Sequence, residues 1–167
     1  MALQTIPNDV YVDGNLSSKT FTPASGSIGN SGIAALAGIA ATKLQKRTYA
    51  NHAQVHGSAA TSQRIVIHRV KGATGTINSF KCLTSVQCVG AATISVQLKK
   101  NGSNILSSAT VLDSTSPANF VIEDAAGFTS QALVQGDVLE ADITATAGGG
   151  TLGQGFYCVA EIDEDAV

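Results

Sequence analysis

Residues 90–113, GAATISVQLKKNGSNILSSATVLD, have the pattern of a β-hairpin. In the first half of this stretch, apolar residues at the even positions alternate with polar ones, which is the two-residue period of a strand with one buried face. Asn101 and Gly102 follow, and both residue types tolerate the positive φ values that a tight hairpin turn needs. The stretch therefore predicts a strand over 92–100, a turn, and a return strand over 104–112.

Further strand patterns extend from residue 63 to the C-terminal end of the sequence. They alternate between apolar and polar residues and are separated by short segments rich in Gly, Ser and Asn, with no helical pattern between them. This spacing favours an all-β fold, an antiparallel β-sandwich of jelly-roll-like type, in which 125–136 crosses between sheets and 147–155 is a mobile hairpin loop. The predicted strands span 63–70, 76–88, 92–100, 104–112, 118–123, 137–146 and 154–163.

The segment before residue 63 is predicted to be organised differently. Residues 1–62 have the character of an extended N-terminal arm and connector, and residues 63–167 that of the sandwich domain. Within the arm, the apolar spacing over 31–47 predicts one short helix, and 48–62 is expected to connect it to the first strand.

Charged residues make up only 13% of the 167 residues, and the net charge is −2. Soluble domains typically contain about 25% charged residues, so part of this surface is expected to be covered by uncharged polar side chains or by another subunit. The run Ile65-Val66-Ile67 is apolar on both strand faces, which suggests a central strand or a subunit contact. We expect Ile65 and Ile67 to lie in a subunit interface and the chain to form a homotrimer.

No pattern of residues indicates an enzyme, a cofactor site or a metal site. The three cysteines lie in apolar, strand-like contexts typical of buried free thiols. His52 and His56 are four residues apart, but they lack the glutamate of a zinc-protease motif, and we interpret them as solvated. The sequence also has no basic stripe for nucleic acid and no apolar run long enough to cross a membrane.

The acidic residues are interpreted as surface charges. Glu140 and Asp142 share a strand face opposite the apolar row of the same strand, so neither has the desolvated environment that a general acid needs. The acidic end of the chain, residues 161–165, is expected to be a solvated strand end and tail.

Two longer stretches resemble small virion proteins of tailed bacteriophages. NSGIAALAGIAATKLQKRTYANHAQ is similar to the segment that precedes their β-domain, and RIVIHRVKGATGTINSFKC looks like the start of the β-domain itself. The resemblance covers roughly residues 28–165. It implies a capsid decoration (cement) or head-fibre-type protein that is made in the host cytoplasm and is located on the outer capsid surface of the virion.

Under this resemblance the partners are the major capsid protein and other copies of the chain. The arm would then contact the capsid through an apolar and basic segment. The residues expected in that contact are Ile33, Leu36, Ile39, Lys43, Leu44, Lys46 and Arg47.

The alternative function is a receptor- or carbohydrate-binding β-sandwich module of a phage fibre or tail. Such modules commonly stack sugars on exposed aromatic rings. The sequence contains no Trp, and Tyr11, Tyr49 and Tyr157 are scattered along it, so a sugar-binding platform is the less favoured hypothesis.

Overall fold

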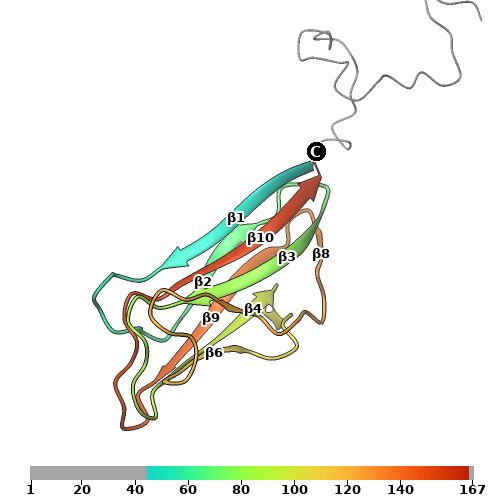
Figure 1. Cartoon of the computed structure of the whole chain (residues 1–167). Coiled ribbons are helices and arrows are strands. Elements are labelled where there is room, and N and C mark those ends of the chain that lie inside the picture. The colour runs from blue at the N-terminus through green and yellow to red at the C-terminus, as the bar shows by residue number, and fades with distance from the viewer. Residues whose placement is uncertain (1–44, 166–167) are drawn as a thin grey trace, which may run out of the picture. The chain divides into compact units, whose positions relative to one another are not determined.

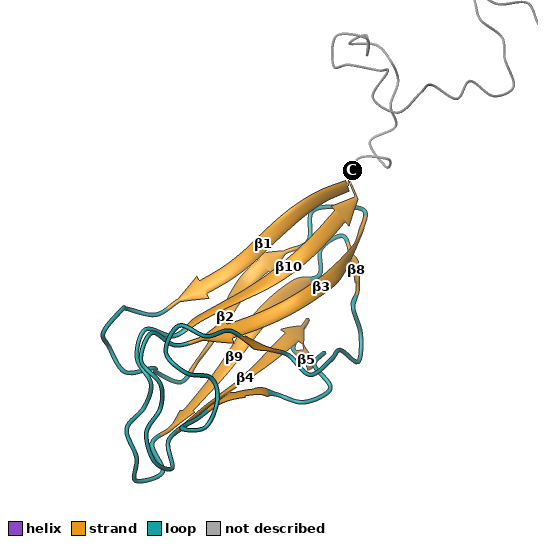
Figure 2. Cartoon of the chain, in the orientation of Figure 1, coloured by secondary structure: helices purple, strands orange, loops and turns teal. Residues whose placement is uncertain are grey.

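The computed structural model describes residues 45–165, which form two antiparallel β-sheets packed face to face (Figure 1). The predicted all-β sandwich is therefore confirmed. Figure 2 shows that loops join the strands throughout this part of the chain. The strands are β1 (Gln45–Ala53), β2 (Gln63–Arg69), β3 (Thr74–Leu83), β4 (Thr93–Lys100), β5 (Ser103–Asn104), β6 (Thr110–Leu112), β7 (Glu123–Asp124), β8 (Ala132–Val134), β9 (Val138–Thr146) and β10 (Tyr157–Asp165).

The two sheets exchange strands along the chain. The β1 sheet has the order β1-β10-β3, with β7 and β8 both paired to β3. The β2 sheet has the order β2-β9-β4, with β5 and β6 both paired to β4. Because β1 to β4 alternate between the sheets and β9 and β10 return beside β2 and β1, the strand order is that of a jelly roll.

The hairpin predicted around Asn101 and Gly102 is present. Their φ values are 50° and 84°, as the turn requires. Ile94, Val96 and Leu98 are all fully buried, so the predicted register of β4 is confirmed.

The return strand of this hairpin is shorter than predicted. It is split into β5 and β6, because the chain between them turns inward and buries both Ile105 and Leu106. The Leu106 N–H donates to Gln97 Oε1 at 3.1 Å, so a side chain of β4 replaces the missing ladder bond. Two consecutive buried residues break the strict alternation of a strand, which explains the interruption.

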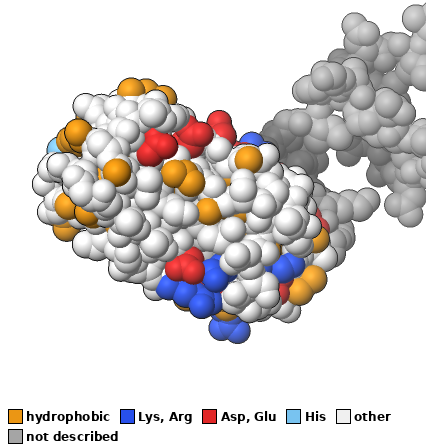
Figure 3. Space-filling view, turned by 90° about the horizontal axis from the view of Figure 1, so that it is seen from below, with side chains coloured by type: hydrophobic (Ala, Val, Ile, Leu, Met, Phe, Trp, Pro, Cys, Tyr) orange, Lys and Arg blue, Asp and Glu red, His pale blue; other side chains and the backbone are white. Residues whose placement is uncertain are grey.

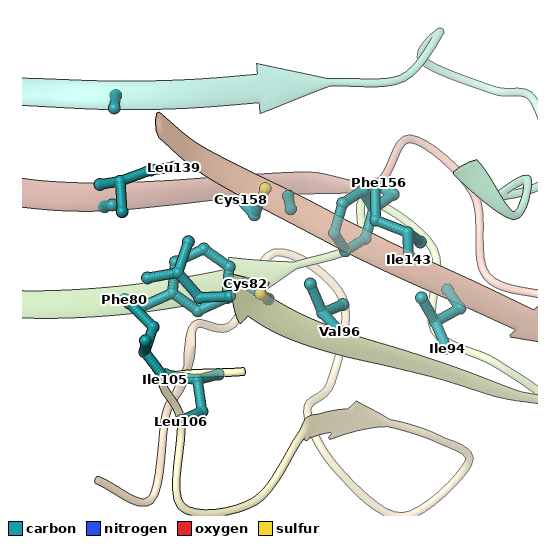
Figure 4. Close-up of a cluster of buried hydrophobic side chains, with 14 of the residues drawn as sticks. Phe80, Cys82, Ile94, Val96, Ile105, Leu106, Leu139, Ile143, Phe156 and Cys158 are labelled. Carbon is teal, nitrogen blue, oxygen red and sulfur yellow. The ribbon is translucent and has the colours of Figure 1, made fainter. Parts of the chain in front are cut away.

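The core lies between the sheets and draws rows of side chains from both (Figure 4). Phe156 and Cys158 of the β10 segment face the core with Phe80 and Cys82 of β3, while Ile143 of β9 packs from the other sheet. All three cysteines are buried and free, as predicted. Burial raises the pKa of Cys158 to about 12, so this thiol stays protonated at neutral pH.

The predicted boundary at residue 63 is wrong, because the sandwich includes β1. Residues 45–53 pair with β10 along their whole length, whereas 48–62 was predicted to be a connector. The last residues of the helix predicted over 31–47 are also in β1, and 31–44 lie outside the described residues. Ala50 is the one fully buried side chain of β1, so the local apolar signal is weak and pairing with β10 decides the conformation.

The strand predicted over 118–123 is also wrong. Phe120 has a φ of 59°, which is incompatible with a strand, and Phe120, Val121 and Ile122 are all exposed. The chain enters the β1 sheet only at Glu123, the first residue of β7.

The glycine-rich segment 147–155 was predicted to be a mobile hairpin loop, but it packs against the loop that joins β3 to β4. Thr151 and Val89 exchange backbone hydrogen bonds of 3.0 and 2.9 Å. At Gly150 a Cβ atom would lie 2.1 Å from the Val89 carbonyl oxygen, so glycine is needed for this close approach of two backbones.

The buried row of β4 yields a stability prediction. Leu98→Ala is expected to lower the free energy of unfolding by about 2–5 kcal/mol, since it removes a fully buried side chain and leaves a cavity. Ser95→Ala on the opposite face is expected to cost less than about 0.5 kcal/mol. Gln97→Ala is not a neutral control, because it removes the acceptor of the Leu106 N–H. Urea unfolding of the two variants checks the register, and equal midpoints would contradict it.

Candidate partner-binding surfaces

The sandwich has two dissimilar ends. At the loop end, defined as residues 54–62, 84–92, 113–122 and 147–156, four connections between the sheets lie together (Figure 2). At the opposite end, which we call the strand end, Gln45 of β1 pairs with Asp165 of β10. Because β1 runs from the strand end to the loop end, the two ends are separated by the full length of the sheet (Figure 1).

Exposed apolar side chains gather at the loop end. Six of the ten large apolar side chains that are exposed among the described residues belong to its loops. Figure 3 shows hydrophobic side chains toward the left of the view. Clusters of this kind mark interaction surfaces more often than isolated exposed residues do. The six residues are Val55, Val86, Val89, Phe120, Val121 and Ile122.

Hydrogen bonds between the loops hold this surface in place. The Phe120 N–H donates to the Thr84 carbonyl at 2.8 Å, and the Gln87 N–H donates to Asn119 Oδ1 at 2.6 Å. The ring of His56 stacks on Phe120, with the ring centroids 6.5 Å apart. The loop end is therefore tied to one backbone arrangement, which lowers the conformational entropy lost when a partner binds.

The strand end contains a buried carboxylate between the two sheets. Glu164 of β10 points inward, and His68 Nε2 donates to its Oε1 at 2.5 Å. The backbone N–H groups of Lys71 and Gly72 donate to Oε2 at 2.9 and 2.7 Å. A bulge in the pairing of β2 with β9 turns His68 inward opposite Leu139 and so makes this contact possible.

These contacts keep Glu164 ionised. Burial raises the pKa of Glu164, but the hydrogen bonds from Gly72, Lys71 and His68 together lower it more, and its net pKa lies below the usual value. The prediction that residues 161–165 form a solvated end is wrong for Glu164, which is buried. The physical reason is that Glu164 continues the inward row of β10, and its carboxylate is satisfied there by backbone donors.

Ion pairs occupy the outer face of the β2 sheet. Arg64 pairs with Glu140 at 2.6 Å, and Lys99 pairs with Asp142 at 3.1 Å. The hydrogen bond from Arg64 holds the pKa of Glu140 below its usual value. Figure 3 shows Lys and Arg side chains next to Asp and Glu side chains near the lower edge of the view. Both acids thus lie on the outer face, as predicted, and each has a cation as partner.

Of the seven arm residues predicted to bind a capsid, Lys46 and Arg47 lie within the described part of the chain. Lys46 is exposed at the strand end. Arg47 pairs with Asp163 at 2.9 Å and with Glu161 at 3.0 Å on the outer face of the β1 sheet. Its guanidinium is therefore already paired with carboxylates of the sandwich itself. The others, Ile33, Leu36, Ile39, Lys43 and Leu44, lie outside the described residues.

The two predicted interface residues face the core instead. Ile65 and Ile67 are partly buried and pack against the core cluster. Val66, between them, has 57% of its surface exposed, and β2 is an edge strand rather than a central one. The outward apolar side chain of this strand is thus Val66, because its neighbours point to the opposite face.

The loop end was not predicted from the sequence as a surface. The available signal was the apolar run from Phe120 to Ile122 in a segment flanked by Pro117 and polar residues, and it was interpreted as a strand. The His68–Glu164 contact was missed as well. It joins residues that are 96 apart in sequence, and no local pattern marks such a pair.

The buried carboxylate predicts a pH-dependent contribution to stability. Glu164→Gln is expected to lower the free energy of unfolding by about 1–3 kcal/mol at neutral pH, because a charged acceptor of buried donors is lost. The folded-state pKa of Glu164 lies below its unfolded value. This contribution is therefore fully present above the ordinary pKa of 4.5 and is lost as the pH falls through the folded-state value.

Urea unfolding of both proteins between neutral pH and acid pH measures this contribution. The difference between the natural chain and the Glu164→Gln variant should shrink below the ordinary glutamate pKa. Asp142→Asn, which removes a partly exposed pair, is the matched control and should cost less than about 1 kcal/mol. A difference that stays constant across the pH range would contradict the assignment to Glu164.

No family model and no curated protein matches the chain. Within residues 45–165 no group of three or more His, Cys, Asp or Glu side chains is placed to hold a metal ion. No helix in the described part of the chain is long and apolar enough to span a membrane.

Proposed function

We propose that this protein is a non-enzymatic structural protein of a tailed-bacteriophage virion that binds the outer capsid surface and stabilises or decorates it. The major capsid protein and other copies of the chain are the partners in this proposal. The N-terminal residues attach the protein to the capsid, and the sandwich projects from the attachment.

The observation that carries this proposal is the fixed apolar surface of the loop end. Six exposed apolar side chains are presented by loops that are hydrogen-bonded to one another, an arrangement suited to contact with another protein. The jelly-roll order is compatible with a capsid role, since this fold recurs in viral capsid and lectin domains. The fold alone does not define a function, so the sequence resemblance to phage virion proteins provides the link to the capsid.

The attachment is tested by separating the N-terminal residues from the sandwich. A chain that begins at Leu44 keeps β1 and is expected to melt cooperatively near the midpoint of the full chain. It should fail to sediment with virions from which the protein has been removed. Removal of residues up to 60 is not an equivalent test, because it deletes β1 and exposes the edge of β10.

A matched pair of full-length variants tests the apolar contact within the arm. Ile33→Ser/Leu36→Ser/Ile39→Ser should abolish sedimentation with the virion, since it removes three apolar side chains from the proposed contact. Ile6→Ser/Val10→Ser/Val12→Ser removes the same number elsewhere in the arm and should preserve it. If the chain beginning at Leu44 sediments as well as the full chain, the arm is not the attachment.

Self-association is expected to use the loop end. It offers six exposed apolar side chains, whereas β2 offers Val66 alone, so the loop end can bury far more apolar area between copies. Light scattering of the full chain should report a trimer, and Val86→Asp/Val89→Asp should produce a monomer because unpaired carboxylates would be buried. Val66→Asp, the control, should leave the trimer intact. A natural chain that is monomeric at micromolar concentration would contradict this prediction.

A second candidate function is recognition of a receptor or a carbohydrate by the loop end. The observation that favours it is the exposed ring of Phe120, stacked on His56 at the end of the sandwich farthest from Gln45. Exposed rings can stack on the apolar faces of sugars. Glycan-array binding that disappears in Phe120→Ala would favour this candidate over self-association.

A further inference from the structure

One side of the sandwich is an open seam between two strand edges. β1 and β2 are the outermost strands of their sheets on this side, so one edge of each lacks a neighbouring strand within the described residues. Unpaired strand edges present backbone donors and acceptors that an additional extended chain can pair with.

The half of the seam near the loop end is closed by side chains. Gln63 Nε2 lies 2.6 Å from His52 Nε2 and so joins β2 to β1. The Gln54 side chain also bonds both the N–H and the carbonyl of Thr61, at 2.8 Å each. Burial lowers the pKa of His52, so its ring is neutral at neutral pH and can accept the hydrogen bond from the Gln63 amide.

The other half of the seam, near the strand end, is open. A hollow of about 450 Å³ lies there, bordered by Lys46 and Thr48 of β1, Ile67 and Arg69 of β2, and Lys71 in the following turn. This volume falls in the range of about 300–1,000 Å³ that ligand sites occupy. A second hollow adjoins it and shares Arg69 and Lys71.

Cations at the rim of this hollow have no ion-pair partner among the described residues. Lys46, Arg69 and Lys71 are all exposed, and none of them forms an ion pair with another residue in the range 45–165. The two carboxylates beside them are engaged. Glu164 accepts from His68 and two backbone N–H groups, and Asp165 accepts from the Thr74 hydroxyl. The three cations also outnumber the two carboxylates in the lining, so the net charge around the hollow is positive.

We propose that the open half of the seam binds an extended, carboxylate-rich segment of a partner protein. The backbone of the segment pairs with the free edge of β1 or of β2. Its carboxylates pair with Lys46, Arg69 and Lys71. Arg69 can bind a carboxylate with two parallel hydrogen bonds. Under the proposed function, on which this identification of the partner rests, the segment belongs to the capsid surface next to the point where the N-terminal residues join β1.

An extended peptide fits this hollow better than a nucleic acid does. Phosphates satisfy the cations and can accept from backbone N–H groups, but they supply no donors for the carbonyl groups that alternate with those N–H groups along a strand edge. The hollow also includes the apolar side chain of Ile67, which suits an apolar side chain of a peptide. The ring that borders the hollow is the partly buried imidazole of His68, which is hydrogen-bonded to Glu164, and the lining contains no Phe, Tyr or Trp to supply the base stacking that usually complements cations in single-strand binding sites.

Fluorescence polarisation of the full chain with fluorescein-labelled octaglutamate tests the proposal. Binding is expected at low salt and should weaken at high salt, since the exposed charges are screened. Arg69→Gln/Lys71→Gln should bind about tenfold more weakly. Lys81→Gln/Lys99→Gln removes the same charge elsewhere on the sandwich and should bind within about twofold of the natural chain.

Hydrogen exchange of the natural chain provides a readout that does not depend on variants. Saturating octaglutamate should slow the exchange of backbone N–H groups on the free edge of β1 or β2, and leave the loop end unchanged. Equal weakening by both double variants would overturn the proposal, as would binding without edge protection. Tighter binding of labelled oligothymidylate at the same residues would replace the acidic segment with a phosphate ligand.

This experiment is independent of the virion. If octaglutamate fails to bind while the full chain sediments with virions, the seam inference is wrong and the capsid function stands. If octaglutamate binds at the seam but the full chain does not sediment, the capsid function is contradicted and the binding surface stands.

Discussion

The structure depends on the inward row of β10. Cys158, Ala160 and Ile162 of β10 are fully buried, as is Phe156 just before the strand, and β10 pairs with β1 on one side and with β3 on the other. A strand with neighbours on both sides and one face against the core can pair its backbone groups at both edges while it buries a row of apolar side chains. Both of its neighbours take their register from it. β1, with Ala50 as its one fully buried side chain, holds its place through this pairing.

The same row explains the character of the strand end. Alternation along β10 requires the residue two positions after Ile162 to point inward as well, and that residue is Glu164. A carboxylate at this depth costs free energy unless donors surround it. The turn after β2 supplies two backbone N–H groups and the β2 bulge supplies His68, so the two sheets are joined by polar contacts where the apolar core ends.

The two ends of the sandwich differ in the kind of surface that they offer a partner. The loop end presents apolar side chains on hydrogen-bonded loops, and the strand end presents cations around an open seam. Apolar area contributes mainly affinity, whereas exposed charge contributes mainly orientation and rate of encounter. This division suits a protein that contacts one partner at each end.

The sequence by itself determined the class of fold, the hairpin at Asn101-Gly102, the inward rows of β4, β9 and β10, and the buried state of the cysteines. Each of these depends on residues close together in the chain, through two-residue alternation or through the φ preferences of a turn. The cationic hollow between β1 and β2 was harder to predict from the sequence. Lys46 was predicted to be a capsid-contacting residue of the arm, but its neighbours Arg69 and Lys71 were not linked to it.

Only the tertiary structure decided that residues 45–53 form a strand, that Ile65 and Ile67 face the core, and that Glu164 is buried. In each case the deciding contact joins residues far apart in sequence, such as Gln45 with Asp165 and His68 with Glu164. Local alternation states which residues share a face, but not which face meets the other sheet or which strand lies at an edge. Strand pairing decides that, because it sets the register and leaves the edges of β1 and β2 open.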